Sequence, residues 1–142
     1  MNPFTTTALA AALSASVFAC TPTSDDWHPS TELAADWLAN KGLGLSGPMP
    51  SVAVRWPHEL QDAANDETRE WARGGEIRAL TYPVLRVVQF SNRLDPERHR
   101  SVAVRELAGI VCFERGWCQG MTRAQQEDWI GRVQAEYEAE QN

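Results

Sequence analysis

The most regular alternation of apolar and polar positions lies between Arg98 and Phe113. Apolar residues recur there at i, i+3, i+4 and i+7, the spacing that lines one face of a helix; they are Val104, Leu107, Ala108 and Val111, with Ile110 and Phe113 widening the stripe. Asp95-Pro96-Glu97 supplies a cap and an acidic first turn. The pattern predicts a largely buried helix that organises the fold.

Two charged residues and a glycine interrupt the apolar pattern of this helix. Arg105 and Glu106 place charges in its middle, and Gly109 removes a side chain. A helix selected only for packing would not favour these residues. They are the first candidate functional residues. The alternative is that Arg105 and Glu106 lie at an exposed helix edge, and that Gly109 lets another backbone approach closely.

The same spacing predicts three further helices. One begins near Ser30 and ends before Gly42, one spans His58 to Arg73, and one follows a capping box at Thr122. Their expected inward residues are, in chain order, Leu33, Ala34, Trp37 and Leu38; Leu60, Ala63, Ala64 and Trp71; and Gln126, Ile130, Val133 and Tyr137.

Three stretches have strand propensity: Ser51–Trp56, Ile77–Tyr82 and Val84–Phe90. The last two are separated only by Pro83 and are expected to pair as antiparallel neighbours. The order of elements predicts a small α+β domain over residues 31–142. We expect an antiparallel sheet with helices packed on one face.

The N-terminal segment predicts export. Residues 1–19 carry no charged side chain and include an apolar run too short to span a bilayer, as in a signal peptide. Val17-Phe-Ala-Cys20 resembles the lipobox of bacterial lipoproteins, which would make Cys20 a lipidated first residue. An ordinary cleaved signal is the alternative. Polar, proline-containing residues 20–30 are expected to form a tether.

Cys112 and Cys118 then remain as an even pair in an exported chain, where disulfides persist. Gly116 lies between them and allows the chain to turn back. A disulfide is therefore expected. A metal site is the weaker interpretation, because no Cys-x-x-Cys or His-x-x-x-His grouping accompanies the pair.

The charge balance argues against nucleic acid as a partner. The net charge is −6, and binding to phosphate requires a basic field. The short run Arg98-His99-Arg100 is flanked by acidic residues and is interpreted as solvated surface.

The succession of a strand, a Ser-Val-x-Val-x-Glu-Leu helix and a capped helix carrying Glu127 resembles a minimal zincin metallopeptidase domain. In that family the central helix carries His-Glu-x-x-His, which falls here on Arg105-Glu-Leu-Ala-Gly109. The resemblance implies that Glu106 matches the general base and Glu127 the downstream metal ligand. Both histidine positions are lost, because arginine has no lone pair for a metal and glycine no side chain. A degenerate domain without catalytic residues, metal or cofactor is implied.

Two structural expectations follow from this resemblance. The Arg105 guanidinium is expected within hydrogen-bonding distance of Glu127 or Glu106, where it would hold together two helices that a metal joins in the family. A shallow groove beside the strand Val84–Phe90 is expected to accept an extended peptide by edge pairing.

Three functions remain open from the sequence. The first is an exported, lipid-anchored envelope protein with an inactive zincin-like domain that binds a peptide or another envelope protein. The second is an active hydrolase that uses, for example, Glu106 with His99 or His58. The third is a structural envelope lipoprotein unrelated to peptidases.

Overall fold

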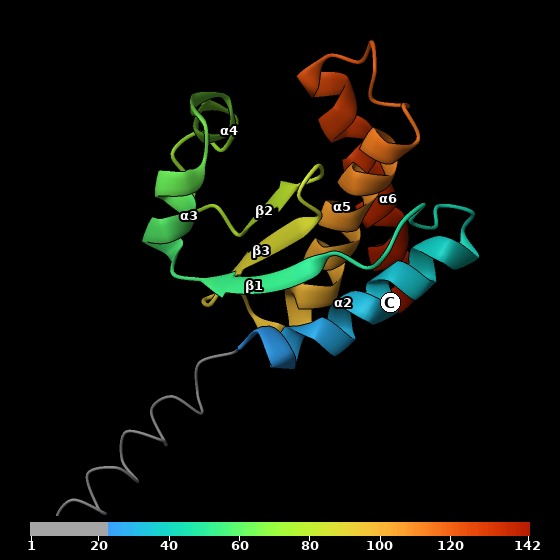
Figure 1. The fold of residues 1–142 in the computed structure, drawn as a ribbon, viewed down its shortest axis with the longest axis horizontal. Helices are drawn as coiled ribbons and strands as arrows, with labels where there is room; N and C mark the ends of the chain where they lie inside the picture. Colours follow the sequence, from blue (N-terminus) through green and yellow to red (C-terminus); the bar gives the residue numbers. More distant parts are fainter. Residues whose placement is uncertain (1–22) are drawn as a thin grey trace, which may run out of the picture.

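The structure is a computed structural model that describes residues 23–142 of the chain (Figure 1). The expected signal peptide and the lipidation site Cys20 lie outside the described residues. The elements are, in chain order, α2 (Ser24–Asn40), β1 (Ser51–Arg55), α3 (Pro57–Ala63), α4 (Asp66–Trp71), β2 (Ala79–Tyr82), β3 (Val87–Ser91), α5 (Pro96–Glu114) and α6 (Arg123–Gln141). The predicted α+β class is confirmed.

The sheet has three strands in the order β1-β3-β2, so β3 is central. Strand β2 pairs antiparallel with β3, with Thr81 opposite Val88, and this confirms the predicted neighbours. Strand β1 pairs with β3 in parallel, with Ala53 opposite Gln89. The sheet is therefore mixed rather than antiparallel, because the chain crosses over through α3 and α4 before it returns as β2 and β3.

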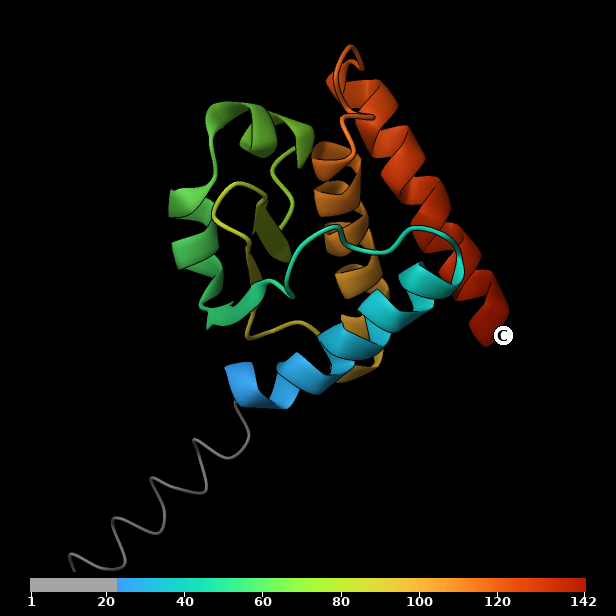
Figure 2. The ribbon, with the colours of Figure 1, turned by 45° about the vertical axis from the view of Figure 1, so that its right-hand side comes forward.

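Helices lie on both faces of this sheet. Val88 and Phe90 of β3 belong to the main core with α2 and α5. On the opposite face, Leu60 of α3 packs with Ala64 and Ile77 in a second, smaller core. Figure 2 shows α3 and α5 on opposite sides of the strands. The expectation that the helices occupy one face is correct for the main core and misses α3.

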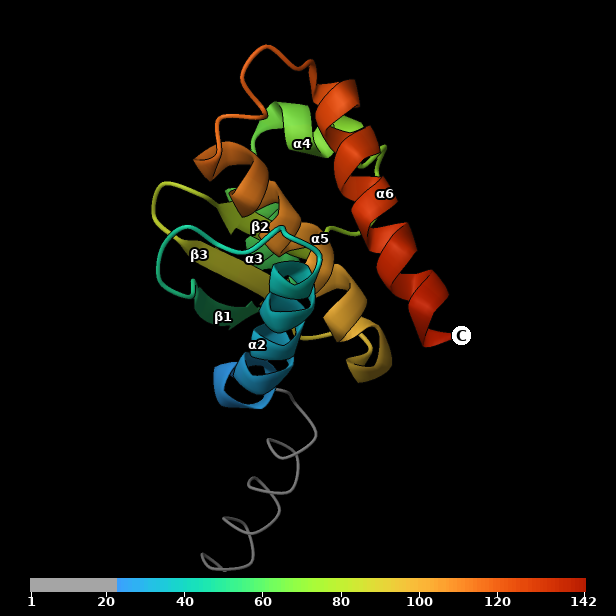
Figure 3. The same cartoon turned by 90° about the vertical axis from the view of Figure 1, so that its right-hand side faces the viewer.

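Helix α5 is the centre of the main core, as predicted, and contacts α2, α6 and β2. The side chain of Asp95 caps the N-terminus of α5 by accepting a hydrogen bond from the Glu97 amide. All the predicted core positions of α5 are buried except Phe113, whose exposed fraction is 50%. Figure 3 shows α6 running alongside α5 on the outer side of the molecule.

The N-terminal helix starts earlier than predicted. Thr23 and Asp26 form a capping box, so residues 24–30 are the first turns of α2 and not an extended tether. The buried Trp27 packs edge-on against Phe90 of β3 and fixes these turns to the core. Leu33 is half-exposed, in contrast to its expected inward position.

The predicted helix from His58 to Arg73 is two short helices. Ala64 has an extended backbone that ends α3, and Asn65 accepts a hydrogen bond from the Thr68 amide to begin α4. Leu60 and Ala64 are buried as predicted, whereas Ala63 is exposed. An asparagine that caps a new helix therefore interrupts the apolar spacing.

Cys112 and Cys118 form the predicted disulfide at the end of α5, with their Cα atoms 5.3 Å apart. Gly116 adopts a φ of 72° between them, a conformation that favours glycine. The bond fits an exported protein. Among residues 23–142, no helix is long and apolar enough to cross a membrane.

Candidate functional site

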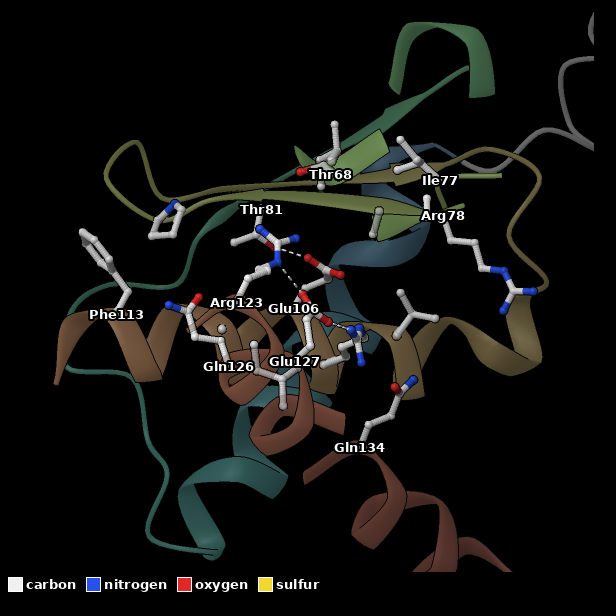
Figure 4. A pocket seen from close by; sticks show the side chains of 18 of the residues that line it. Thr68, Ile77, Arg78, Thr81, Glu106, Phe113, Arg123, Gln126, Glu127 and Gln134 are labelled. Carbon is white, nitrogen blue, oxygen red and sulfur yellow. Dashed lines mark hydrogen bonds and ion pairs between the residues drawn. The ribbon is translucent and has the colours of Figure 1, made fainter. Parts of the chain in front are cut away.

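The candidate site is a cleft of about 880 Å³ between β2 and the helices α5 and α6, with α4 at its rim. Figure 4 shows Phe113 at one end of the cleft and Arg78 at the other, with Thr81, Glu106 and Glu127 between them. A cleft of this size is in the range of ligand-binding sites. All four residues singled out in the sequence line it: Arg105, Glu106, Gly109 and Glu127.

Arg105 pairs with Glu127, as predicted. Its Nη2 atom donates to Oε2 of Glu127 and links α5 to α6. Arg123 occupies the other carboxylate oxygen, with its Nε atom 3.1 Å from Oε1. One carboxylate therefore bridges two guanidinium groups. The exposed fractions of the two arginine side chains are 31% and 32%, so both reach the solvent of the cleft.

Glu106 lies on the β2 side of the cleft, where its carboxylate accepts a hydrogen bond from Oγ1 of Thr81. Burial raises the pKa of Glu106 above its ordinary value, although the Thr81 hydroxyl and the charges of Arg105 and Arg123 act in the opposite direction. The carboxyl group thus retains a proton more readily than a solvated glutamate.

Gly109 lies one helical turn from Arg105 and faces α6. A Cβ atom at this position would meet only the Cδ1 atom of Ile130, at 3.6 Å. This is an ordinary van der Waals contact, and no backbone approaches closely. The alternative explanation from close helix packing is therefore wrong. Gly109 leaves open space in the cleft beside the Arg105–Glu127 pair.

One wall of the cleft is the unpaired edge of β2. The Ser91 amide donates to the Arg78 carbonyl at 2.8 Å, so Arg78, Leu80 and Tyr82 direct their backbone groups toward β3. Ala79 and Thr81 direct theirs away from the sheet. No other segment of residues 23–142 bonds to these outward groups. The expected peptide edge beside Val84–Phe90 is thus wrong, because β3 is paired on both sides. The edge strands are β1 and β2, and the edge that borders the cleft is β2.

Neither histidine of the predicted hydrolase lines the cleft. His99 is buried in the main core between Trp27 and Phe90, with ring centroids at 4.5 Å and 4.4 Å. His58 is exposed on α3, across the sheet. The structure does not bring either ring to Glu106. The interpretation of Arg98-His99-Arg100 as solvated surface is also wrong for His99.

Sequence reasoning missed two residues of the site. Arg123 could have been found, because it precedes Glu127 by four residues on one helix, the spacing of a helical ion pair. Thr81 carried no such signal. Its contact with Glu106 depends on the packing of β2 over α5, which joins residues that are 25 positions apart.

The chemistry of this donor set does not fit the zinc that the resembled family holds. Arg105 stays protonated and Gly109 has no side chain. The Glu127 carboxylate is already engaged by two guanidinium groups. Within the described part of the chain, no three His, Cys, Asp or Glu side chains are grouped to hold a metal ion. Comparison of the chain with protein-family models, curated proteins and solved structures found no significant match.

Proposed function

We propose that this protein is a catalytically inactive, zincin-like peptide-binding domain of the cell envelope, exported and anchored by a lipid at Cys20. The domain binds an extended segment of a peptide or envelope protein along the cleft. The proposed family rests on the zincin resemblance, and the proposed lipid anchor rests on the lipobox resemblance. The binding role is supported independently by the geometry of β2.

The observation that carries the binding role is the free edge of β2 beside the cleft. An extended peptide can add to such an edge by backbone hydrogen bonds, while its side chains alternate between the two faces. Ala79 and Thr81 offer two N–H groups and two carbonyl groups for this pairing. Exposed edges are normally blocked by charge, proline or a covering element. Here the edge opens onto a cleft that can hold side chains.

The inactive state is supported by the Arg105–Glu127–Arg123 bridge. Under the zincin resemblance, Arg105 and Glu127 stand at positions of metal ligands, and the bridge joins α5 to α6 without any Lewis acid. Polypeptide binding by edge pairing requires only backbone groups and a cleft, so the loss of both histidines leaves this function intact.

The test uses a neutral heptapeptide, acetyl-Thr-Val-Gln-Thr-Gln-Val-Thr-amide, and amide chemical-shift changes in the full chain. The Ala79→Pro variant removes one outward N–H, and the matched Ala79→Val variant adds the same number of carbon atoms but keeps it. We expect Ala79→Pro to weaken binding at least tenfold and Ala79→Val to change it less than threefold. Equal binding by both variants, or a wild type that binds neither this peptide nor a charged analogue, would reject the proposal.

The anchor has its own test. In a bacterial host the Cys20→Ser variant is expected to move from the membrane fraction to the soluble periplasmic or culture fraction, with the folded domain intact. Wild-type protein that is soluble after export would contradict the lipid anchor and leave the peptide-binding proposal standing.

A second candidate function, hydrolysis, has one observation in its favour. Thr81 and Glu106 form a hydroxyl–carboxylate pair, and burial raises the pKa of Glu106 toward the range of a general base. Activity of this kind would hydrolyse p-nitrophenyl acetate and would be lost in Thr81→Val. Turnover that Thr81→Val abolishes would favour this candidate over the inactive domain.

A further inference from the structure

The charges in the cleft indicate which peptides it selects, an inference that rests on the proposed binding role. At its centre two guanidinium groups, Arg105 and Arg123, share the single carboxylate of Glu127. A guanidinium has five N–H donors, so most donors of both residues remain available for a second acceptor. The exposed fraction of Glu127 is only 15%, so the arginines and not their partner meet an incoming ligand.

Glu106 offsets this positive charge only in part. Its carboxylate accepts a hydrogen bond from the Thr81 hydroxyl and, among the described residues, forms no ion pair with either guanidinium group, while burial raises its pKa. The centre of the cleft therefore presents two guanidinium groups that still have unused donors, in a protein whose net charge is −6.

Two further arginines line the outer part of the cleft. Arg78 precedes the strand and Arg98 lies in the first turn of α5, and both line the same cleft. In the described chain neither of them forms an ion pair. Glu76 and Glu138 also line the cleft. All four of these outer residues are exposed, so solvent screens their charges and the selection depends on Arg105 and Arg123.

Side chains of a peptide paired with the edge of β2 would point toward these arginines. Thr81 directs its side chain toward α5, as its bond to Glu106 shows. Side chains of directly paired residues project to the same face of a sheet, and residues two apart share a face. A peptide residue opposite Thr81 or Ala79 therefore directs its side chain between β2 and the arginines of α5 and α6.

We infer that the cleft selects an acidic peptide, in which Asp or Glu residues at alternate positions enter between Arg105 and Arg123 while the backbone pairs with β2. Planar guanidinium groups match a carboxylate in geometry, and their hydrogen bonds to it are charge-assisted. Arg105 and Arg123 already share the carboxylate of Glu127, and the ligand supplies a second carboxylate for their remaining donors.

The test compares the neutral heptapeptide with its acidic counterpart, acetyl-Thr-Val-Glu-Thr-Glu-Val-Thr-amide, by calorimetric titration of the full chain at pH 7.5 and low salt. We expect the acidic peptide to bind at least tenfold more tightly, with an advantage that decreases as salt is added. The Arg123→Gln variant should remove most of this advantage, because Glu127 keeps Arg105 as its partner and the fold is retained.

The control is Arg132→Gln on the same helix, where Arg132 pairs with Asp128 and is 72% exposed. It has the same change in net charge and should keep the preference for the acidic peptide. Equal loss in the two variants would show general charge attraction and overturn the inference. Equal binding of both peptides, sensitive to Ala79→Pro, would overturn the acidic selection alone. Binding of neither peptide would overturn both the selection and the proposed function.

Discussion

Helix α5 carries polar side chains on two sides, and the two sides differ in whether these side chains have hydrogen-bond partners. On the cleft side, Arg105 and Glu106 each have a partner on another element, Glu127 and Thr81. On the core side, His99 is buried between aromatic rings, and neither of its ring nitrogens has a hydrogen-bond partner in the described structure. The cleft side is organised around charge, whereas the core side excludes it.

The difference shows where α5 holds the fold and where it is available for binding. A buried polar atom without a partner destabilises the folded state, so His99 contributes through its ring surface and only when neutral. The charged groups of the cleft remain partly exposed, and their donors can be shared with a ligand.

The Arg105→His, Gly109→His double variant should convert the cleft side into a metal site. Two imidazoles one turn apart would join Glu127, which is the ligand set of the resembled family. We expect zinc to bind with a Kd of about 1 µM or tighter, equivalent to about 8 kcal/mol, measured by competition with a chromophoric chelator. A Cβ atom at position 109 would be in ordinary van der Waals contact with Cδ1 of Ile130.

Each single variant is the control and should bind zinc at least tenfold more weakly. Adding Glu127→Gln to the double variant should also reduce the affinity. A folded double variant with no affinity for zinc would contradict the proposed zincin-like geometry. Stoichiometric zinc in the wild-type protein would contradict the metal-free site.

On the core side, stability should depend on pH through His99. Burial, with a smaller contribution from the charge of Arg100, lowers the pKa of His99 from 6.5 to about 4. The unfolded chain therefore binds the proton more tightly, and stability falls as the pH decreases from about 6.5 to 4. The loss should approach roughly 3 kcal/mol in urea unfolding.

His99→Phe should remove this dependence, because the aromatic contacts with Trp27 and Phe90 are kept without a titrating group. The exposed His58 provides the control, and His58→Gln should retain the wild-type dependence. An unchanged dependence in His99→Phe would show that another group is responsible.

Removal of the bridging carboxylate should have a smaller effect. Glu127→Ala leaves Arg105 and Arg123 side by side without their shared partner. Because both guanidinium groups are partly exposed, we expect a loss of about 1 to 2 kcal/mol in the free energy of unfolding. Asp128→Ala removes the neighbouring exposed carboxylate, which is paired with Arg132, and should cost less than about 0.5 kcal/mol. Equal losses would remove the special role of Glu127.

The smallest expected effect is that of Glu106→Gln. Burial raises the pKa of Glu106, so the folded state holds its proton more tightly than the unfolded state, and wild-type stability decreases as the pH rises through the folded pKa. The neutral amide avoids this cost. We expect Glu106→Gln to be more stable than the wild type at pH 8, with a smaller difference at pH 4. A variant destabilised at pH 8 would contradict the burial of the carboxylate.

The sequence predicted the features that depend on neighbouring residues. The Asp95 cap, the apolar stripe of α5 and the Cys112–Cys118 disulfide were all recognisable within a few positions of one another. The helical pair of Arg123 and Glu127 is of the same kind and could have been recognised. The Arg105–Glu127 contact could not be predicted from neighbouring residues alone. Its prediction relied on the zincin resemblance for the packing of the two helices.

Features that depend on distant pairing were missed or misplaced. The parallel pairing of β1 with β3 makes β3 the central strand, and no local pattern indicates which strand is central. The same uncertainty placed the peptide edge on Val84–Phe90 instead of β2. The capping box at Thr23 was local, but the proline at position 29 favoured a tether over the helix that Trp27 holds in place.

Hydrogen exchange of the Ala79 and Thr81 amides, with and without saturating acidic heptapeptide, tests the central claim most directly. Both N–H groups point away from the sheet and should exchange rapidly in the free protein. Edge pairing predicts that at least one of them becomes protected by more than tenfold in the complex, while the outward amides of β1 do not change. Peptide binding without protection of Ala79 or Thr81 would contradict a ligand strand on β2.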